Sequence, residues 1–404
     1  MKNYQIFLSI VFVFNAASAQ NWTKLSPGTV NNLNSVFFIT TDTGYVVGDS
    51  GMILKTSNGG IAWTRQIPEH PTSLSFKSVF FRDINTGWLV GQYGIILRTT
   101  NGGASWLLPG TQMPFTEVLN SVHFPTPDTG YTVGGGYMTG EYGWQDRSFN
   151  AGSIWINGGG AGVRCLKSVY FTDVSAGYAV GDGGTIMKTV NGAVNWILQL
   201  SGTVNTLYSV YFTDMNHGYI VGDSGTILKT TNGGDSWVAV PSGISSRLRS
   251  VWFNSMNTGY AAGDHGAILN TADGGNTWTN LFSGTTLRLN SICFPAIDIG
   301  YAAADSGTLL KTTNGGGVGV SETCQDSKPI TVYPNPLHDI LSIELPLKQG
   351  ATCLSLFSVA GKKILERQVI GPKAQIDIRD LRAGIYFIRF RNEKMSEIRF
   401  VIKE

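Results

Sequence analysis

The tetrapeptide Gly-Asp-Ser-Gly at residues 222–225 is a sequence in which a serine hydroxyl can act as a nucleophile. Ser224 could attack a carbonyl group if a histidine took its proton and a carboxylate oriented that histidine. The turn recurs with Ser50 and Ser306, but other copies carry a different residue at the serine position, namely Tyr93, Gly183 and His265. A nucleophile would not be exchanged so freely, and glycine and aspartate are typical of tight turns. We therefore interpret the tetrapeptide as a hairpin turn and expect no catalytic residue.

Few other side chains have the spacing of a metal or cofactor site. The five histidines and four cysteines form no C-x-x-C or comparable ligand pattern. Cys165 and Cys293 fall at or near strand positions, so the sequence predicts no disulfide framework, metal or cofactor. Five turns carry an aspartate: Asp49, Asp182, Asp223, Asp264 and Asp305. They could form a ring of carboxylates, but capping of their own turns also accounts for them, and we prefer that local interpretation.

The elements that must position these residues come from one unit that is repeated seven times. Each copy begins with a serine followed by valine or isoleucine, at intervals of 41 to 47 residues: Ser35, Ser78, Ser121, Ser168, Ser209, Ser250 and Ser291. A Gly-aromatic strand, a glycine turn, a strand like Ile-Leu-Lys-Thr and the sequence Asn-Gly-Gly-x-x-Trp follow. Four short strands in about 40–45 residues are typical of one propeller blade. The sequence thus predicts an all-β chain with a β-propeller over residues 20–316.

The seventh copy ends without its tryptophan, because Gly319 stands at that position. Residues 21–28 align with the fourth strand of other copies, and Trp22 precedes Val36 by the usual 14 residues. We therefore expect residues 21–28 to complete the last blade and to close a seven-bladed ring without an exposed edge.

The tryptophan segments resemble the Asp-box, the S/T-x-D-x-G-x-T-W hairpin of sialidase-type propellers. The segment Thr271–Trp278 matches it fully, and the copy that begins at Thr189 is degraded. The resemblance implies a structural turn between the third and fourth strands, away from catalysis, built by Asn58, Trp63, Asn101, Trp106, Asn150, Trp155, Asn191, Trp196, Asn232, Trp237, Asp273 and Trp278. Over residues 21–316 the repeat resembles the photosystem II assembly factor family of seven-bladed propellers. That resemblance implies a fold and no particular function.

The two ends of the chain carry targeting features. Residues 1–19 combine Lys2, an apolar run and Ala17-Ser18-Ala19, which is typical of a signal peptide. After a linker at 317–328, alternating strands in 329–404 predict a small β-sandwich. Its order of Tyr-Pro-Asn-Pro, Gly-Lys and Leu-x-x-Gly-Ile-Tyr motifs resembles the type A sorting domain of the type IX secretion system of Bacteroidetes. The resemblance implies export across the outer membrane, usually with removal of this domain.

The charge distribution and the hydropathy of the chain restrict the classes of partner that the sequence allows. Residues 329–404 hold 12 Lys+Arg and 8 Asp+Glu, and the remainder holds 17 against 19. Neither part has the concentrated positive charge of a nucleic-acid-binding protein. No apolar run after residue 20 is long enough to cross a membrane, so we expect a secreted or surface-attached product.

Three departures from the repeat length fall on one predicted rim, over residues 66–73, 108–118 and 135–149. Exposed aromatic and polar side chains there would suit a protein or glycan ligand: His70, Tyr93, Phe115, Tyr137, Glu141, Tyr142, Trp144, Gln145, Asp146 and Arg147. A decayed third blade accounts for the same irregularity equally well.

We expect a non-catalytic binding or assembly module. The alternative is a glycan-active hydrolase, sialidase-like or xyloglucanase-like, that uses an unrecognised carboxylate pair.

Overall fold

The computed structural model describes residues 21–69, 72–109, 117–136, 142–160, 162–317, 331–333, 339–344, 352–358, 363–369, 371, 373–392 and 395–404. The expected signal peptide at 1–19 lies outside these residues, as does all but Gly317 of the expected linker at 317–328. The chain divides after Gly319 into two compact units. Within the described residues no helix is long and apolar enough to span a membrane.

The first unit consists of seven antiparallel sheets, which we number as blades in chain order. Blade one contains β2 (Leu33–Phe38), β3 (Gly44–Gly48), β4 (Ile53–Thr56) and β5 (Thr64–Arg65); blade two contains β6 (Phe76–Phe81), β7 (Gly87–Gly91) and β8 (Ile96–Thr99); blade three contains β9 (Glu117–His123), β10 (Gly130–Gly136), β11 (Gly143–Ser148) and β12 (Ile156–Gly160). Blade four contains β13 (Leu166–Phe171), β14 (Gly177–Gly181), β15 (Ile186–Thr189) and β16 (Ile197–Gln199); blade five contains β17 (Leu207–Phe212), β18 (Gly218–Gly222), β19 (Ile227–Thr230) and β20 (Val238–Ala239). Blade six contains β21 (Leu248–Phe253), β22 (Gly259–Gly263), β23 (Ile268–Thr271) and β24 (Thr279–Leu281); blade seven contains β25 (Leu289–Cys293), β26 (Gly300–Ala304), β27 (Leu309–Thr312) and β1 (Thr23–Leu25).

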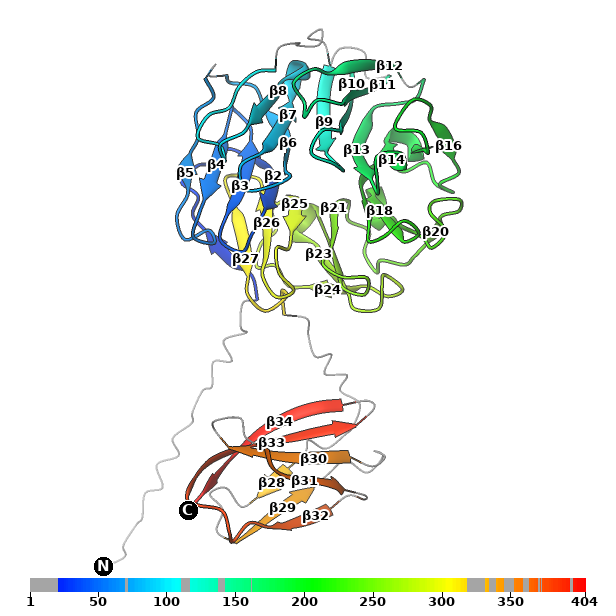
Figure 1. Ribbon diagram of the computed structural model, residues 1–404. Helices are drawn as coiled ribbons and strands as arrows, with labels where there is room; N and C mark the ends of the chain where they lie inside the picture. The colour runs from blue at the N-terminus through cyan, green and yellow to red at the C-terminus, as the bar shows by residue number, and fades with distance from the viewer. Residues whose placement is uncertain are drawn as a thin grey trace, which may run out of the picture. The chain divides into compact units, whose positions relative to one another are not determined.

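The first strands of the blades form the inner wall of a closed ring. They lie side by side in the order β2, β6, β9, β13, β17, β21 and β25, and β25 returns to β2 (Figure 1). The sheets therefore follow one another around a ring, and the expected all-β propeller fold is confirmed.

The ring closes through the N-terminal strand, as the sequence predicts. In the ladder between β1 and β27, Thr23 lies opposite Lys311 and Leu25 opposite Leu309. The indole of Trp22 is fully buried and meets Phe294 edge-on at 5.9 Å between ring centroids. A side chain from the start of the unit thus completes the core of the last blade.

Neighbouring blades are joined by a repeated aromatic stack. In blade one the buried Tyr45 stacks on Phe81 of blade two at 3.8 Å, and its hydroxyl donates to the carbonyl of Gly102 at 2.7 Å. Only glycine fits at Gly44, since a Cβ atom there would lie 2.5 Å from the Phe38 ring. Such stacks bury large apolar surfaces between successive blades and hold the ring together.

Blades two and three depart from the repeat in different ways. In blade two the outer strand is reduced to one bridge, between Arg98 and Leu107. In blade three the extra residues lengthen two strands, since β10 and β11 pair from Gly130–Ser148 to Gly135–Gly143. The interpretation of residues 143–148 as part of a loop was wrong, because this segment pairs with strands on both sides.

The described residues of the second unit form two sheets. They are built from β28 (Thr331–Tyr333), β29 (Ile340–Glu344), β30 (Thr352–Ser358), β31 (Lys363–Val369), β32 (Lys373–Asp377), β33 (Gly384–Asn392) and β34 (Met395–Lys403). The orders are β28-β29-β32 and β31-β30-β33-β34. One core cluster contains Leu341 and Ile376 from the first sheet and Leu356 and Ile388 from the second. The two sheets therefore share one apolar interior, as in a β-sandwich.

Candidate functional site

The Gly-Asp-Ser-Gly segment is a turn, as expected. The residue after each aspartate or its equivalent adopts a left-handed conformation, with φ of 54° at Ser224, 53° at Tyr93 and 59° at His265. The turn is closed by the Thr226 amide, which donates to the Asp223 carbonyl at 3.0 Å. Glycine at the equivalent Gly183 adopts the same conformation with φ of 67°, without the cost that a side chain adds. Serine is therefore one of several residues that this backbone accepts.

The aspartates of these turns do not cap their own turns, and our local interpretation of them was wrong. Their carboxylates reach the first strands of the same or the next blade. Asp264 accepts from Nε of Arg249 at 2.5 Å, and Asp223 accepts from Nε of Arg247 in the next blade. Asp182 lies 3.1 Å from the Lys167 ammonium. The carboxylates thus form an arc in which each has a cationic or amide partner.

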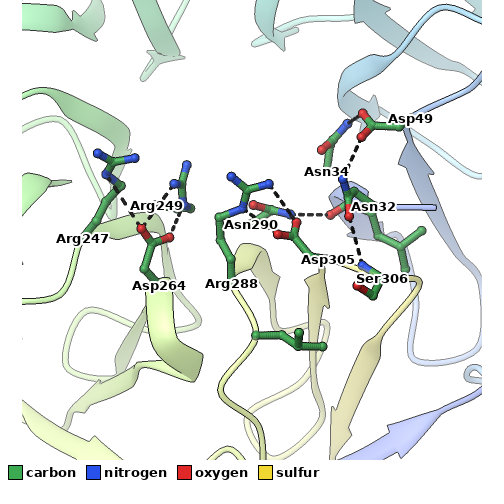
Figure 2. A network of polar contacts seen from close by, with 12 residues as sticks. Asn32, Asn34, Asp49, Arg247, Arg249, Asp264, Arg288, Asn290, Asp305 and Ser306 are labelled. Atoms are coloured by element: carbon green, nitrogen blue, oxygen red, sulfur yellow. Dashed lines mark hydrogen bonds and ion pairs between the residues drawn. The ribbon is translucent and has the colours of Figure 1, made fainter. Parts of the chain in front are cut away.

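Figure 2 shows this network across blades six, seven and one. Arg288 and Asn290 converge on Asp305, at 3.0 Å from Nη2 and 2.9 Å from Nδ2. The amide of Ser306 donates to Oδ1 of Asn32 at 3.0 Å. The two asparagines Asn32 and Asn34 in turn donate to Asp49 at 3.0 and 2.9 Å. The contacts therefore cross the joint at which the ring closes.

The charges of this network are fixed by their neighbours. Burial alone would raise the pKa of Asp49, but hydrogen bonds from Asn34 and Asn32 and the charge of Lys77 bring it below its ordinary value. Burial also opposes the charge of Arg247, yet the hydrogen bond and charge of Asp223 raise its pKa. Both groups stay ionised at neutral pH, so the site presents permanent charge.

The network surrounds a hollow of about 370 Å³ at the mouth of the central channel. Its lining includes the seven repeat serines and the residue before each of them: Asn34, Lys77, Asn120, Lys167, Tyr208, Arg249 and Asn290. Six of the serine hydroxyls accept the backbone N–H of the next blade's first strand, as in the bond from Val251 to Ser209 at 3.2 Å. The serines therefore join the blades, and the residues before them supply the polar surface of the mouth.

Aromatic side chains of the same strands line the channel. Their ring centroids follow one another at 4.7 to 6.5 Å around Phe37, Phe80, His123, Tyr170, Tyr211 and Trp252. Burial and the charge of Arg82 lower the pKa of His123 to about 3, so this histidine is neutral. The mouth is thus a charged hollow above an apolar layer.

The predicted rim is only partly described. His70, Phe115, Tyr137 and Glu141 lie outside the described residues. Tyr93 and Tyr142 are exposed, as expected. Trp144, Gln145, Asp146 and Arg147 belong to β11, and Asp146 is buried and accepts from the Trp144 indole at 3.0 Å. The expected exposure was therefore wrong for Asp146, whereas Trp144, Gln145 and Arg147 are partly exposed side chains of a strand.

The functional candidates that the sequence reasoning missed are Tyr208, Arg247, Arg249 and Arg288. They occur one or three residues before a repeat serine, so an alignment of the copies at those two offsets would have shown a charged arc.

Cys165, Cys293 and Cys353 are free thiols in the described residues. In the same residues no group of three His, Cys, Asp or Glu side chains is arranged to hold a metal.

Comparisons with known proteins agree with this architecture. Among solved structures, "YCF48 bound to D1 peptide" is similar with a TM-score of 0.60 and 21% identity, covering 74% of this chain and 98% of that one. YCF48 from Cyanidioschyzon merolae has a TM-score of 0.59 and 20% identity, covering 72% of this chain and 98% of that one. A glycoside hydrolase of Niastella koreensis, NkGH74, has a TM-score of 0.58 and 14% identity, covering 80% and 59%. These likenesses show the propeller fold alone.

Sequence families give a more specific result, although no curated protein matches the chain. The model of a secretion system C-terminal sorting domain matches residues 331–404, in agreement with the resemblance to a type IX sorting tail. The model described as photosynthesis system II assembly factor YCF48 matches residues 14–113 and 196–318, which is more than half of the chain. The chain therefore belongs to the YCF48 family of photosystem II assembly factor propellers and carries a C-terminal secretion sorting domain.

Proposed function

We propose that this protein is an exported, non-catalytic propeller that binds a carboxylate-bearing polypeptide segment at the mouth of its central channel. The observation that carries the proposal is the arrangement of Arg247, Arg249 and Arg288 on two adjacent blades. The side chains of Arg247 and Arg288 are 37% and 41% exposed, whereas those of their partners Asp223 and Asp305 are 26% and 22% exposed. In these two pairs the carboxylate supports its arginine from the more buried side, and the cation is the part that a ligand can reach. Arg249 is 16% exposed and its partner Asp264 23%, so this third cation contributes charge from a more buried position.

The arginines retain donors for a ligand. A guanidinium has five N–H groups, and the network uses Nε of Arg247 and Nε and Nη2 of Arg249. The aromatic ring of Tyr208 contacts both cations, with its centroid 5.0 and 5.4 Å from their central carbon atoms. Guanidinium groups held in fixed positions bind carboxylates well because less side-chain entropy is lost on binding.

Amide side chains alternate with the cations around the mouth. Asn34, Asn120 and Asn290 line the hollow, and their Nδ2 groups donate within the protein, so that their Oδ1 atoms are the groups that can accept from a peptide N–H. Cations together with these amides favour an acidic segment or a chain terminus over an uncharged glycan. The relative whose structure is titled "YCF48 bound to D1 peptide" binds a peptide on the same fold, which supports this ligand class.

Export accounts for the second unit. The sorting domain at 331–404 would direct the chain through the type IX secretion machinery to the cell surface or the medium. The partner would then be an extracellular or outer-membrane protein. Tyr93 and Tyr142 are exposed on the predicted rim and could widen the contact around the mouth.

The hydrolase alternative needs a pair of carboxylates free to act as acid and base or nucleophile. Asp146, an acidic residue of the predicted rim, is 3% exposed. Each of the five turn aspartates contacts a cation or an amide. The similarity to NkGH74 concerns the fold alone. No arrangement among the described residues favours hydrolysis, and turnover in a glycan hydrolysis screen would overturn the proposal.

A direct test uses fluorescent peptides and the full exported chain. A peptide rich in aspartate and glutamate with a free C-terminus should bind, whereas the same peptide with lysine at the acidic positions should not. Loss of one buried partner in a charge-assisted contact costs about 2–5 kcal/mol, so Arg288→Ala or Arg249→Gln should weaken binding by roughly 30-fold or more. Arg65→Ala, at an exposed position on β5, is the matched control and should change nothing. Equal binding of both peptides, or equal affinity of all variants, would contradict the proposed site.

A further inference from the structure

The outer edge of blade four is unusually apolar. Six side chains in and around β16 are 59% to 92% exposed: Val190, Val194, Ile197, Leu198, Leu200 and Val204. No charged residue occurs between Lys188 and Asp214. Exposed apolar groups that gather in this way mark interaction surfaces more often than isolated ones do.

β16 is also an open edge. Among the described strands it pairs with β15 alone, with Ile197 opposite Lys188 and Gln199 opposite Ile186. It lies on the circumference of the propeller, where another chain can reach it (Figure 1). An edge strand of this kind presents unpaired N–H and C=O groups to a second strand.

Four of the other six blades protect the equivalent edge. β1 carries Lys24, and β5 has only two residues, one of them the charged Arg65. In blade two Pro109 follows the bridge residue Leu107 by two positions, and in blade five Pro241 follows the end of β20 by two positions. These are the features with which natural sheets prevent edge-to-edge association. Blade four lacks them over its described outer edge.

We propose that β16 joins two copies of this chain into a homodimer through antiparallel pairing of the two edges. We favour a second copy of this chain as the partner because the strip carries no charge. Such a strip offers nothing for a charged partner to complement, whereas the same strip of a second copy is equally uncharged and apolar. With the two-fold axis at Leu198, that residue faces its own counterpart, Ile197 faces Gln199, and Trp196 faces Leu200. No like charges meet in this register, and Leu198 and the Trp196–Leu200 pairs bring apolar side chains together.

The interface is short, so the dimer is weak. Contacts well below the standard interface size belong to transient associations, which places the dissociation constant in the micromolar range. If the mouth binds peptides as proposed, the dimer presents two mouths and binds a surface carrying many copies of the ligand more tightly. The dimer itself does not depend on that function.

Sedimentation velocity of the full exported chain, from about 1 to 200 µM, tests the proposal. The unsubstituted chain should dimerise, and Leu198→Lys should weaken the dimer by at least about 10-fold, because it places two like charges opposite each other. An equimolar mixture of the Leu198→Lys and Leu198→Glu variants should restore it. Val238→Lys, at an exposed position on the outer strand of blade five, is the matched control. A monomer throughout the range, or a dimer that Leu198→Lys leaves intact, would refute the proposal.

The register has its own test. Under mild oxidation Leu198→Cys should form a disulfide-linked dimer, since its two copies lie opposite each other, and Val204→Cys should form much less. The unsubstituted chain, with its own cysteines, sets the background. Equal linking of both variants would show that the copies associate in another way.

Discussion

Replacement of Trp22 by alanine tests whether the N-terminal strand is part of the last blade. This indole is fully buried, although it is separated from the rest of blade seven by more than 200 residues of chain. It packs in one core cluster with Leu281, Leu289 and Phe294. If the closure is real, one substitution near the start of the unit must destabilise the whole ring.

The magnitude follows from the burial. Removal of a large aromatic side chain from a packed core costs about 3–5 kcal/mol, which includes the cavity that is left behind. Natural domains are stable by about 5–15 kcal/mol, so the loss is a large share of the total. For a unit of this size each kcal/mol lowers the melting temperature by roughly 2–4 °C, and a fall of about 6–20 °C is expected.

The assay is unfolding of the full exported chain by denaturant and by scanning calorimetry. Trp22→Phe, which keeps most of the apolar volume, should recover much of the loss. Val30→Ala, at an exposed position nearby, should leave the free energy of unfolding within about 0.5 kcal/mol. A change below about 1 kcal/mol for Trp22→Ala would refute the closure as the source of this stability.

Three further predictions follow from the same structure. Ser50, Ser224 and Ser306 should remain unlabelled by a fluorophosphonate probe, because they are turn residues; labelling of any one would contradict that assignment. The folded-state pKa of His123, about 3, lies below the ordinary value near 6.5, so protonation of the unfolded chain should reduce stability as pH falls from about 6.5 toward 3. At pH 5 this loss of stability should be at most about 2 kcal/mol, and it should be absent in His123→Phe. Denaturant unfolding at pH 7 and pH 5 measures it, and an equal change in the free energy of unfolding of both proteins would refute the prediction. Removal of residues 329–404 should leave a folded propeller in the periplasm of the native host, and its arrival at the surface or in the medium would show that another signal directs export.

The repeat made most of the fold predictable from sequence. The seven serines, the Gly-aromatic pairs and the fitting Trp22 each reflect a packing requirement that recurs in every blade. The third blade was less predictable because Gly134, Gly135 and Gly136 are typical of a loop. Pairing with a neighbouring strand overcame that local preference, as tertiary context often does.

The site was harder to predict because its contacts are not local. Asp223 pairs with Arg247 of the next blade, 24 residues away, and Ser306 meets Asn32 only where the ring closes. An aspartate next to a glycine has the same appearance in sequence whether it caps its own turn or supports an arginine. Only the arrangement of neighbouring blades distinguishes the two roles.

The location of the peptide site is the central claim, and photo-crosslinking tests it most directly. An acidic peptide with a photoreactive group would be bound to the full exported chain, irradiated and mapped by mass spectrometry. Adducts should concentrate at the lining residues Tyr208, Arg249, Arg288 and Asn290 and at Arg247, which lies beside Asp264, and excess unlabelled acidic peptide should remove them. Adducts confined to the outer strands or to the turns that precede them, with the mouth unlabelled, would contradict the account.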